Sequence, residues 1–283
     1  MKTYTRDRFI KQFARAMGLT ILIVTTILLI LPIITLFITS LKLDTEYNRY
    51  PIVWFPAVAQ WVNYETVLNL ARFSGAALRT VLLGIPYAIV ITLSSALAGY
   101  AFARFRMPIS SRLFGVVVAL LIVPEMVILI PTFIVYAQLK LTNTYWPWVL
   151  SAIAGSPFYI FLFRQFFLNF PKELEDAAEV DGCGPIRIFV QIFLPNSTAV
   201  IATVMFFAFN AVWASYLMPL IYLSDSQQLL GVVIATEFKN PRGITLTTLS
   251  MAGTVVYILP PVIAFFLAQK HILKGVIMSG IKG

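Results

Sequence analysis

The residue types that most often carry chemistry are isolated from one another in this chain. Its 283 residues include one cysteine, Cys183, and one histidine, His271. A lone cysteine cannot form an internal disulfide, and neither residue has the neighbouring ligands that a zinc or haem site requires. The sequence also lacks a Gly-x-x-x-x-Gly-Lys-Ser/Thr phosphate-binding loop. We therefore predict a chain without catalytic residues, metal ligands or an ATP site of its own.

One segment is distinguished by its acids, since five of the twelve Asp and Glu residues fall in the range 173–181. Pro171 suits a first helical turn, and acids placed early in a helix favour the positive end of its dipole. Gly182 is predicted to end this helix in the left-handed conformation, after which Pro185 starts a second short helix. Residues 169–196 are thus predicted to form a compact helical knob.

Both predicted helices of this knob carry apolar faces. In the first helix, Leu174, Ala177 and Ala178 share one face at i, i+3, i+4 spacing. The stripe on the second helix consists of Ile186, Phe189, Val190 and Phe193. Small alanine side chains permit the close approach of another protein. The competing interpretation is a charged loop that stays out of the bilayer.

Four residues inside apolar runs are candidates for a solute pathway. Glu125 is the only acid in such a run, and a charge there costs about 2.5–3.5 kcal/mol or more unless it is paired, solvated or neutralised. Asn210, Trp213 and Tyr216 offer an amide and two aromatic rings to a sugar. The competing interpretations are a protonated or hydrogen-bonded Glu125 beside a bend at Pro124, and simple helix packing for the aromatic residues.

The elements that must position these residues are membrane-spanning helices. Hydrophobic residues make up 59% of the chain and charged residues only 12%, with a mean hydropathy of +0.86; soluble domains carry about 25% charged residues. A helix needs about 20 apolar residues to cross the hydrocarbon core. The apolar runs lie at 16–39, 79–102, 112–138, 145–168, 197–223 and 249–270. We therefore expect an all-α membrane protein with six transmembrane helices.

The distribution of Lys and Arg predicts the orientation of these helices. The net charge of +9 lies between the apolar runs rather than in a basic stripe, so the charge pattern does not point to nucleic acid. Fourteen Lys and Arg residues fall on the side that carries both termini and seven on the other, which places both termini in the cytoplasm. The predicted organisation is a cytoplasmic tail (1–15), a transmembrane domain (16–272) and a second cytoplasmic tail (273–283).

The knob resembles the coupling motif of ABC importer permeases, which reads Glu-Ala-Ala, three residues, Gly, nine residues and Ile-x-Leu-Pro. The match keeps the spacing throughout, and the one departure is an Asp in place of the Glu, which preserves the charge but shortens its reach. The resemblance implies coupling to an ATPase through Asp176, Ala177, Ala178, Asp181, Gly182, Ile192, Leu194 and Pro195.

Matches elsewhere extend the resemblance over almost the whole chain. Asn63-Tyr64, Tyr100-Ala-Phe-Ala-Arg104, Pro131 and the ending at 275–283 look like the carbohydrate-uptake branch, in particular the second permease subunit of the maltose type. This resemblance implies the type I importer architecture, with six helices and a cytoplasmic coupling helix, in a prokaryotic inner membrane. The implied function is to form half of the pathway for a sugar or oligosaccharide.

The same resemblance implies the partners of the chain. These are a second permease subunit, two ATP-binding cassette subunits that hold ATP and Mg²⁺, an extracytoplasmic solute-binding protein and membrane lipid. Two departures bear on the solute. Relatives carry Trp-Asn-Asp/Glu where this chain has Trp213-Ala-Ser, and Asn-Ser where it has Arg79-Thr80. An atypical solute, or a partner subunit that makes most solute contacts, would account for both.

Two other classes of protein compete with this interpretation. A secondary transporter, driven by an ion gradient, usually shows internal repeats and midplane charges, whereas Glu125 is the only intramembrane acid and no clear repeat is visible. An intramembrane enzyme needs an acid–base constellation, which the isolated Cys183 and His271 do not provide.

Overall fold

The computed structural model describes residues 2–105, 108–239 and 243–280, with side chains described from residue 12 to residue 271 apart from the two internal gaps. Within these residues the regular structure is helical, except for one antiparallel bridge between Lys239 and Thr245. The chain divides into two compact units. Unit 1 comprises residues 1–70 and 238–258, and unit 2 comprises residues 71–237 and 259–283.

Unit 1 contains α1 (Lys2–Ser40), α2 (Asp44–Tyr47), α3 (Val62–Asn69) and the first part of α14 (Thr247–Gly280). The apolar part of α1, Gln12–Ser40, is long enough to cross a membrane, and none of the residues in its most apolar window is buried within the chain. The Asp44 carboxylate accepts hydrogen bonds from the backbone and hydroxyl of Thr248 at 3.1 and 2.9 Å, which caps the start of α14.

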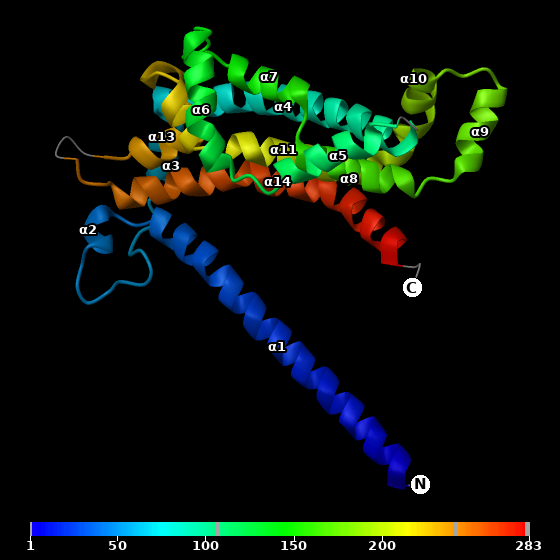
Figure 1. The fold of residues 1–283 in the computed structure, drawn as a ribbon. Coiled ribbons are helices and arrows are strands. Elements are labelled where there is room, and N and C mark those ends of the chain that lie inside the picture. Colours follow the sequence, from blue (N-terminus) through cyan, green and yellow to red (C-terminus); the bar gives the residue numbers. More distant parts are fainter. Residues whose placement is uncertain (1, 106–107, 240–242, 281–283) are drawn as a thin grey trace. The chain divides into compact units, whose positions relative to one another are not determined.

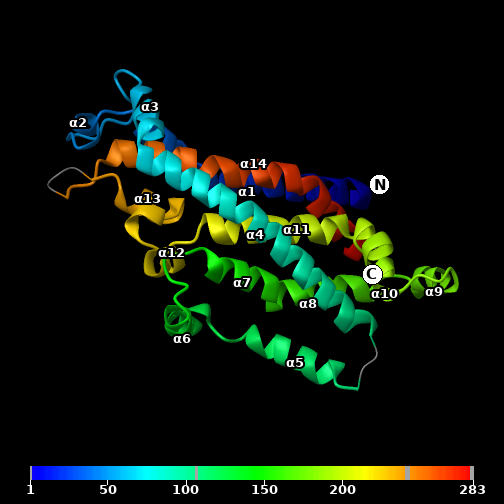
Figure 2. The same cartoon turned by 90° about the horizontal axis from the view of Figure 1, so that it is seen from above.

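Unit 2 is built around α4 (Ala71–Arg104), which packs against α7 (Trp146–Ala154), α8 (Pro157–Leu168) and α11 (Thr198–Trp213). The approach of α4 to α8 is very close at Gly99. A Cβ atom at Gly99 would lie 2.6 Å from the Phe163 Cβ and 3.0 Å from the Arg164 backbone nitrogen. Small residues permit such contacts between membrane helices. Figures 1 and 2 show α4 running along the unit beside α7 and α8.

The third predicted span, 112–138, is not one continuous helix. It consists of α5 (Ser110–Leu120) and α6 (Glu125–Gln138), which meet at an angle of 101°. Pro124 lies at the break with extended backbone angles (φ −63°, ψ 132°), because a proline removes a helical hydrogen bond and is best tolerated just before or at a helix start. The prediction of a single helix is therefore wrong at this point, although the two halves together have the composition of one span.

The fourth and fifth predicted spans are interrupted as well. The run 145–168 is divided into α7 and α8 at Gly155, whose φ of +77° favours glycine. The run 197–223 ends as a long helix at Trp213 and continues as the short α12 (Leu217–Tyr222). Beyond α12 lie η3 (Asp225–Gln227) and α13 (Leu230–Thr236). The described residues contain five candidate spans, or six when the bent pair is counted as one.

The two predicted tails are mostly helical. Residues 2–15 belong to α1, and residues 273–280 belong to α14. The last three residues of the predicted C-terminal tail lie outside the described part of the chain. The boundaries predicted from charge and hydropathy therefore mark changes in composition rather than ends of helices.

Candidate functional site

The predicted knob exists and lies at one end of unit 2, with α12 and α13 at the other end (Figure 2). It consists of α9 (Lys172–Val180), α10 (Pro185–Ile188), the π-helix η1 (Phe189–Phe193) and the 3₁₀-helix η2 (Pro195–Ser197). Pro171 precedes the first turn of α9, and Pro185 is the first residue of α10. The knob predicted for residues 169–196 is thus present, but its second helix is α-helical only over α10 and continues as η1 and η2.

The turn between α9 and α10 depends on Gly182. Its φ is +76°, its N–H donates to the Glu179 carbonyl at 3.0 Å, and the next N–H, of Cys183, donates to the Ala178 carbonyl at 2.9 Å. This pair of hydrogen bonds is the Schellman pattern that ends many helices. A left-handed stop at Gly182 is therefore confirmed.

The faces of the knob differ from the predicted ones. On α9 only Ala178 is buried, whereas Leu174 and Ala177 are exposed. On the second element the buried residues are Ile188, Phe189 and Phe193, while the predicted Ile186 and Val190 are 74% and 51% exposed. From Phe189 onward the chain is no longer α-helical, because in η1 the Leu194 N–H donates to the Phe189 carbonyl five residues back. This wider turn changes the face that an α-helical period predicts.

Arg104, the last residue of α4, joins the knob to the helix bundle. Its guanidinium lies 3.5 Å from the Glu175 carboxylate on α9, and its Nη2 atom donates at 2.9 Å to the carbonyls of Phe167, in the last turn of α8, and of Phe170, just beyond α8. The guanidinium carbon also lies 5.1 Å from the centroid of the Phe193 ring in η1, a cation–π distance. One side chain therefore contacts α4, α8, α9 and η1 together.

An aromatic cluster reinforces this connection. The ring of Tyr100, one turn before Arg104, lies 4.8 Å from Phe193, 5.2 Å from Phe189 and 6.3 Å from Phe167, measured between centroids. Tyr100 itself is 2% exposed. Rings at such distances gain stabilisation beyond simple burial. The knob is consequently packed firmly against the ends of α4 and α8.

The remaining residues of the predicted coupling set lie on or beside the knob. Asp176 is exposed and forms a loose pair with Lys172 at 3.7 Å. Asp181 caps the end of α9, Ile192 and Leu194 are half-buried, and Pro195 starts η2. The structure brings Ala178 into the same core as Tyr100 and Ile188. Arg104 and Glu175 were not predicted as partners, because no local spacing signals a contact between them.

The knob exposes several apolar side chains, which together are called its outward face here. Val180 is 88% exposed, and Leu174, Ile186 and Val190 are also exposed. Exposed apolar groups rimmed by charges are characteristic of surfaces that bind another protein. Lys172, Asp176 and Arg187 supply such charges nearby.

The predicted pathway residues do not form one site in this chain. Glu125 is the first residue of α6, where the helix dipole favours an acid. This candidate for the solute pathway is exposed within this chain. The helices of this chain therefore do not enclose it.

The three fifth-span candidates lie at the end of α11. The Asn210 side-chain amide donates to the Phe206 carbonyl at 2.8 Å, and the Trp213 ring stacks on Phe209 with centroids 5.5 Å apart. Trp213 is 2% exposed, so it serves packing here rather than presenting a free ring to a solute. Tyr216, at the break before α12, is 40% exposed and remains accessible.

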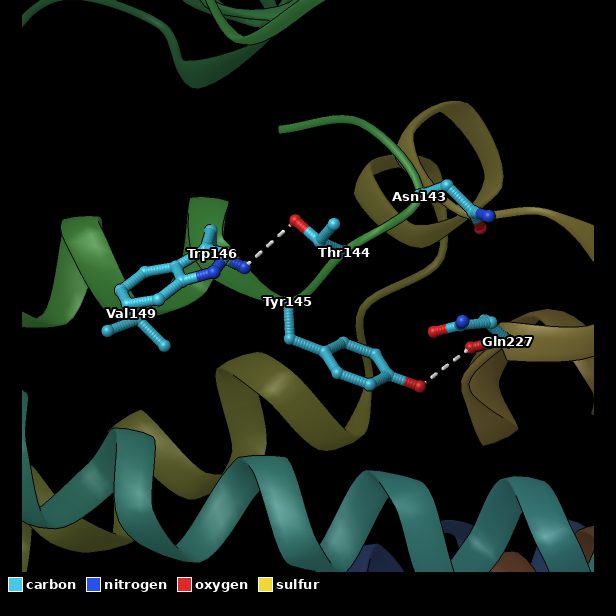
Figure 3. Close-up of a pocket in the computed structure, with 6 residues that line it drawn as sticks. All are labelled: Asn143, Thr144, Tyr145, Trp146, Val149 and Gln227. Atoms are coloured by element: carbon cyan, nitrogen blue, oxygen red, sulfur yellow. Dashed lines mark hydrogen bonds between the residues drawn. The ribbon is translucent and has the colours of Figure 1, made fainter. Parts of the chain in front are cut away.

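A hollow lies between the α6–α7 turn and η3 (Figure 3), at the end of unit 2 opposite the knob (Figure 2). Its cavity volume is about 340 Å³. No sequence pattern signals this hollow, because its two sides come from segments far apart in the chain. No group of three or more His, Cys, Asp or Glu side chains able to hold a metal ion occurs within the described ranges.

The chain resembles known membrane transport proteins over most of its length. Residues 91–278 match the family described as "Binding-protein-dependent transport system inner membrane component". The osmoprotective compounds uptake permease protein GgtD of Synechocystis sp. is 32% identical over 89% of this chain and 87% of its own length. The arabinooligosaccharides transport system permease protein AraQ of Halalkalibacterium halodurans is 30% identical over 90% and 91%.

Two further similarities complete the comparison. The sn-glycerol-3-phosphate transport system permease protein UgpE of Rhizobium meliloti is 31% identical over 94% of this chain and 97% of its own length. A chain in the crystal structure of a bacterial ABC transporter that imports the acidic polysaccharide alginate has a similar fold, with a TM-score of 0.79. The two chains are 18% identical, and the match covers 92% of this chain and 96% of the other.

Proposed function

This chain belongs to the family of binding-protein-dependent transport system inner membrane components, and we propose that it forms half of a sugar pathway driven through the knob at 172–197. Members of this family are non-catalytic, multi-pass subunits of ABC importers in the inner membrane. ATP and Mg²⁺ belong to partner ATPase subunits in this proposal, which agrees with the missing phosphate loop.

The observation that carries the proposal is the combination of an exposed apolar surface with a rigid attachment. Val180, Ile186 and Val190 point away from the core of unit 2, so an ATPase subunit can cover them without unfolding the knob. Arg104 and Tyr100 hold the other side of the knob against α4 and α8. A displacement of the knob is therefore passed to α4 and α8 instead of being absorbed by a loose loop.

The proposed assembly contains a second permease subunit, two ATPase subunits and an extracytoplasmic solute-binding protein. The apolar surface of α1 and the side chain of Glu125 are both exposed within this chain. In the proposed assembly, lipid and the second permease subunit shield them from water. The excess of Lys and Arg on the terminal side supports cytoplasmic termini and a cytoplasmic knob.

The proposed solute class is a sugar, an oligosaccharide or a related osmolyte. Three relatives with 30% identity or more carry names that refer to arabinooligosaccharides, to osmoprotective compounds and to sn-glycerol 3-phosphate. Hydroxyl groups are common to the saccharide and glycerol compounds. Trp213 is buried in this chain, so the second permease is proposed to make most of the solute contacts inside the membrane.

Replacement of Ile186 by Asp tests the proposed contact between the knob and an ATPase subunit, which is called the joint below. The side chain is 74% exposed, so the variant should insert and fold normally. A charge on the surface that the ATPase subunit is proposed to cover should weaken binding of that subunit. The readouts are co-purification of the ATPase and solute-stimulated hydrolysis in the reconstituted transporter. Ile52→Asp is the matched control, since Ile52 is 66% exposed in unit 1. Normal assembly and stimulation in Ile186→Asp would refute the proposed joint.

A further inference from the structure

The hollow between the α6–α7 turn and η3 has the size of a small-ligand site. Its volume is about 340 Å³, near the lower end of the range for ligand pockets. The lining residues are Asn143, Thr144, Tyr145, Trp146, Val149 and Gln227. Figure 3 shows Trp146 and Val149 on one side and Asn143 and Gln227 on the other.

Hydrogen bonds between the two segments hold the hollow open. The Asn143 N–H donates to the Tyr222 carbonyl at 2.6 Å, and the Asn143 Oδ1 atom accepts from the Ser224 N–H at 2.9 Å. The Tyr145 hydroxyl donates to the backbone carbonyl of Gln227 at 3.1 Å. Asn143 adopts φ +59°, a conformation that asparagine tolerates better than most residues. The site is therefore built before any ligand arrives.

Three hydrogen-bonding groups in the lining are left without a partner. Within the described residues, no hydrogen bond engages the Asn143 Nδ2 atom, the Gln227 side-chain amide or the Trp146 indole N–H. Trp146 is 53% exposed, so its ring is accessible. A hydroxylated ring compound can stack an apolar face on such a ring while its hydroxyl groups bond to the amides.

The lining carries no charge, and two arginines near η3, Arg72 and Arg79, are already engaged with other groups. Arg79 donates through Nε and Nη2 to the Gln228 carbonyl at 3.3 and 3.2 Å. Arg72 pairs with Asp225 and, at 2.7 Å, with Glu237. Neither arginine lines the hollow. An anionic ligand would therefore meet neutral amides in place of a charged partner, and the fork of donors that an arginine offers to carboxylates and phosphates is absent from the lining.

We propose that this hollow is a binding subsite for a neutral, polyhydroxylated solute, with Trp146 as the stacking surface and the amides of Gln227 and Asn143 as hydroxyl-binding groups. The proposal rests on the proposed function, because it gives the imported solute a contact on this subunit at the face opposite the knob. It also narrows the solute class from sugars and their charged derivatives to uncharged ones.

A shallow hollow on an exposed face could instead serve as a docking point for the solute-binding protein. The size and chemistry favour the small solute, since one ring and its hydroxyl groups fit about 340 Å³, whereas stable protein contacts bury about 800 Å² on each partner. Docking of the binding protein is consequently an outcome for the experiment to exclude.

The test uses the complete transporter in lipid nanodiscs, without its binding protein, and saturation-transfer difference NMR of added saccharides. The probes are the neutral saccharides arabinotriose, maltotriose and trehalose, with trigalacturonic acid as the anionic comparison. The variants are Trp146→Ala, Trp146→Phe and Gln227→Ala. Gln227→Ala keeps the backbone carbonyl that Tyr145 binds. Trp54→Ala is the matched control, because Trp54 is 69% exposed in unit 1 and far from this lining in sequence.

We expect at least one neutral probe to bind the native complex, with affinity about five- to tenfold weaker in Trp146→Ala and nearly retained in Trp146→Phe. Gln227→Ala should also weaken binding, and Trp54→Ala should not. The proposal is overturned if no neutral probe binds, if binding is unchanged in both Trp146→Ala and Gln227→Ala, or if trigalacturonic acid shows the same dependence on Trp146. Loss of binding-protein affinity in these variants, with saccharide binding intact, would make the hollow a protein docking site and overturn the proposal as well.

Failure of this proposal is distinguishable from failure of the proposed function. The saccharide measurement needs no ATP and no contact at the knob, whereas the joint is judged from ATPase capture by Ile186→Asp. A transporter with an intact joint and no saccharide at Trp146 would leave the proposed function standing and remove only the subsite.

Discussion

The guanidinium of Arg104 at the end of α4 lies 3.5 Å from the carboxylate of Glu175 on α9. The two side chains are only 11% and 14% exposed, so the pair is shielded from most solvent screening. The same guanidinium donates to one carbonyl in the last turn of α8 and to one just beyond that helix. Arg104 is thus placed to fix the distance between the knob and the helices that its movement would displace.

Replacing Arg104 with Gln should break this connection. Loss of one partner from a buried ion pair costs about 3–5 kcal/mol, and the partial exposure here argues for the lower end. We expect a lower thermal midpoint and reduced solute stimulation of ATP hydrolysis, with the ATPase still bound. Arg104→Lys keeps the charge without the planar fork that contacts Glu175 through Nη1 and both carbonyls through Nη2, and its effect should be intermediate. Wild-type stimulation in Arg104→Gln would show that the contact does not transmit movement.

The positive φ of Gly182 predicts a clear contrast with its neighbour Gly184. Gly182 has φ +76° and Gly184 has φ −74°, and at both positions the space that a Cβ atom would occupy is open to 4 Å. Gly182→Ala should therefore cost about 1–2 kcal/mol through backbone strain, and Gly184→Ala should be nearly neutral. Gly182→Val should add a clash with the bound ATPase. Thermal unfolding measures the backbone strain, and ATPase co-purification measures the clash. Equal thermal midpoints for Gly182→Ala and Gly184→Ala would contradict the strain predicted at Gly182.

The close contact at Gly99 predicts that side chains there force α4 and α8 apart. A Cβ atom at this position would lie 2.6 Å from the Phe163 Cβ, and overpacking costs about 1–3 kcal/mol. Gly99→Leu should lower both the thermal midpoint and the yield of folded protein in detergent. Gly115→Leu is the control, since Gly115 has open space around its Cβ direction. Equal midpoints for these two variants would argue against the packing described.

Glu125 offers a test of the broken span. Glu125→Gln removes a charge from the first turn of α6, which costs about 0.3–1 kcal/mol at a helix start, too little to prevent insertion. We expect a normal amount of protein in the membrane but slower solute uptake, because the residue lies at the 101° bend. Initial uptake rates in proteoliposomes measure this effect. Unchanged kinetics would assign Glu125 to helix capping alone.

Local chemistry made the knob largely predictable from the sequence. Gly182 and Pro185 act on their own turns, so their roles follow from residue type and spacing. The apolar face was harder to predict, because the α-helical period ends where η1 begins, and Ile186 and Val190 are both exposed. The pairing of Arg104 with Glu175 depends on how α4 and α9 pack, and no pattern within either segment reveals it.

For the membrane helices too, features set by local sequence were predictable, and features set by contacts between distant segments were not. Hydropathy located the apolar runs, since a span requires a minimum length of apolar residues. It did not show that Pro124 and Gly155 divide two of them, because many prolines and glycines lie inside continuous membrane helices. Trp213 was a candidate for solute contact until its burial against Phe209 was known. The hollow at Trp146 forms only when two distant turns meet.

Contact between the outward face of the knob and the ATPase is the central claim, and a photo-cross-linker at position 186 in intact membranes tests it most directly. We predict a covalent adduct with the ATPase subunit from position 186, where the side chain is 74% exposed, and none from position 52, where it is 66% exposed. Such an adduct would also place the knob in the cytoplasm. Absence of the adduct from position 186, or equal adducts from both positions, would contradict the claim.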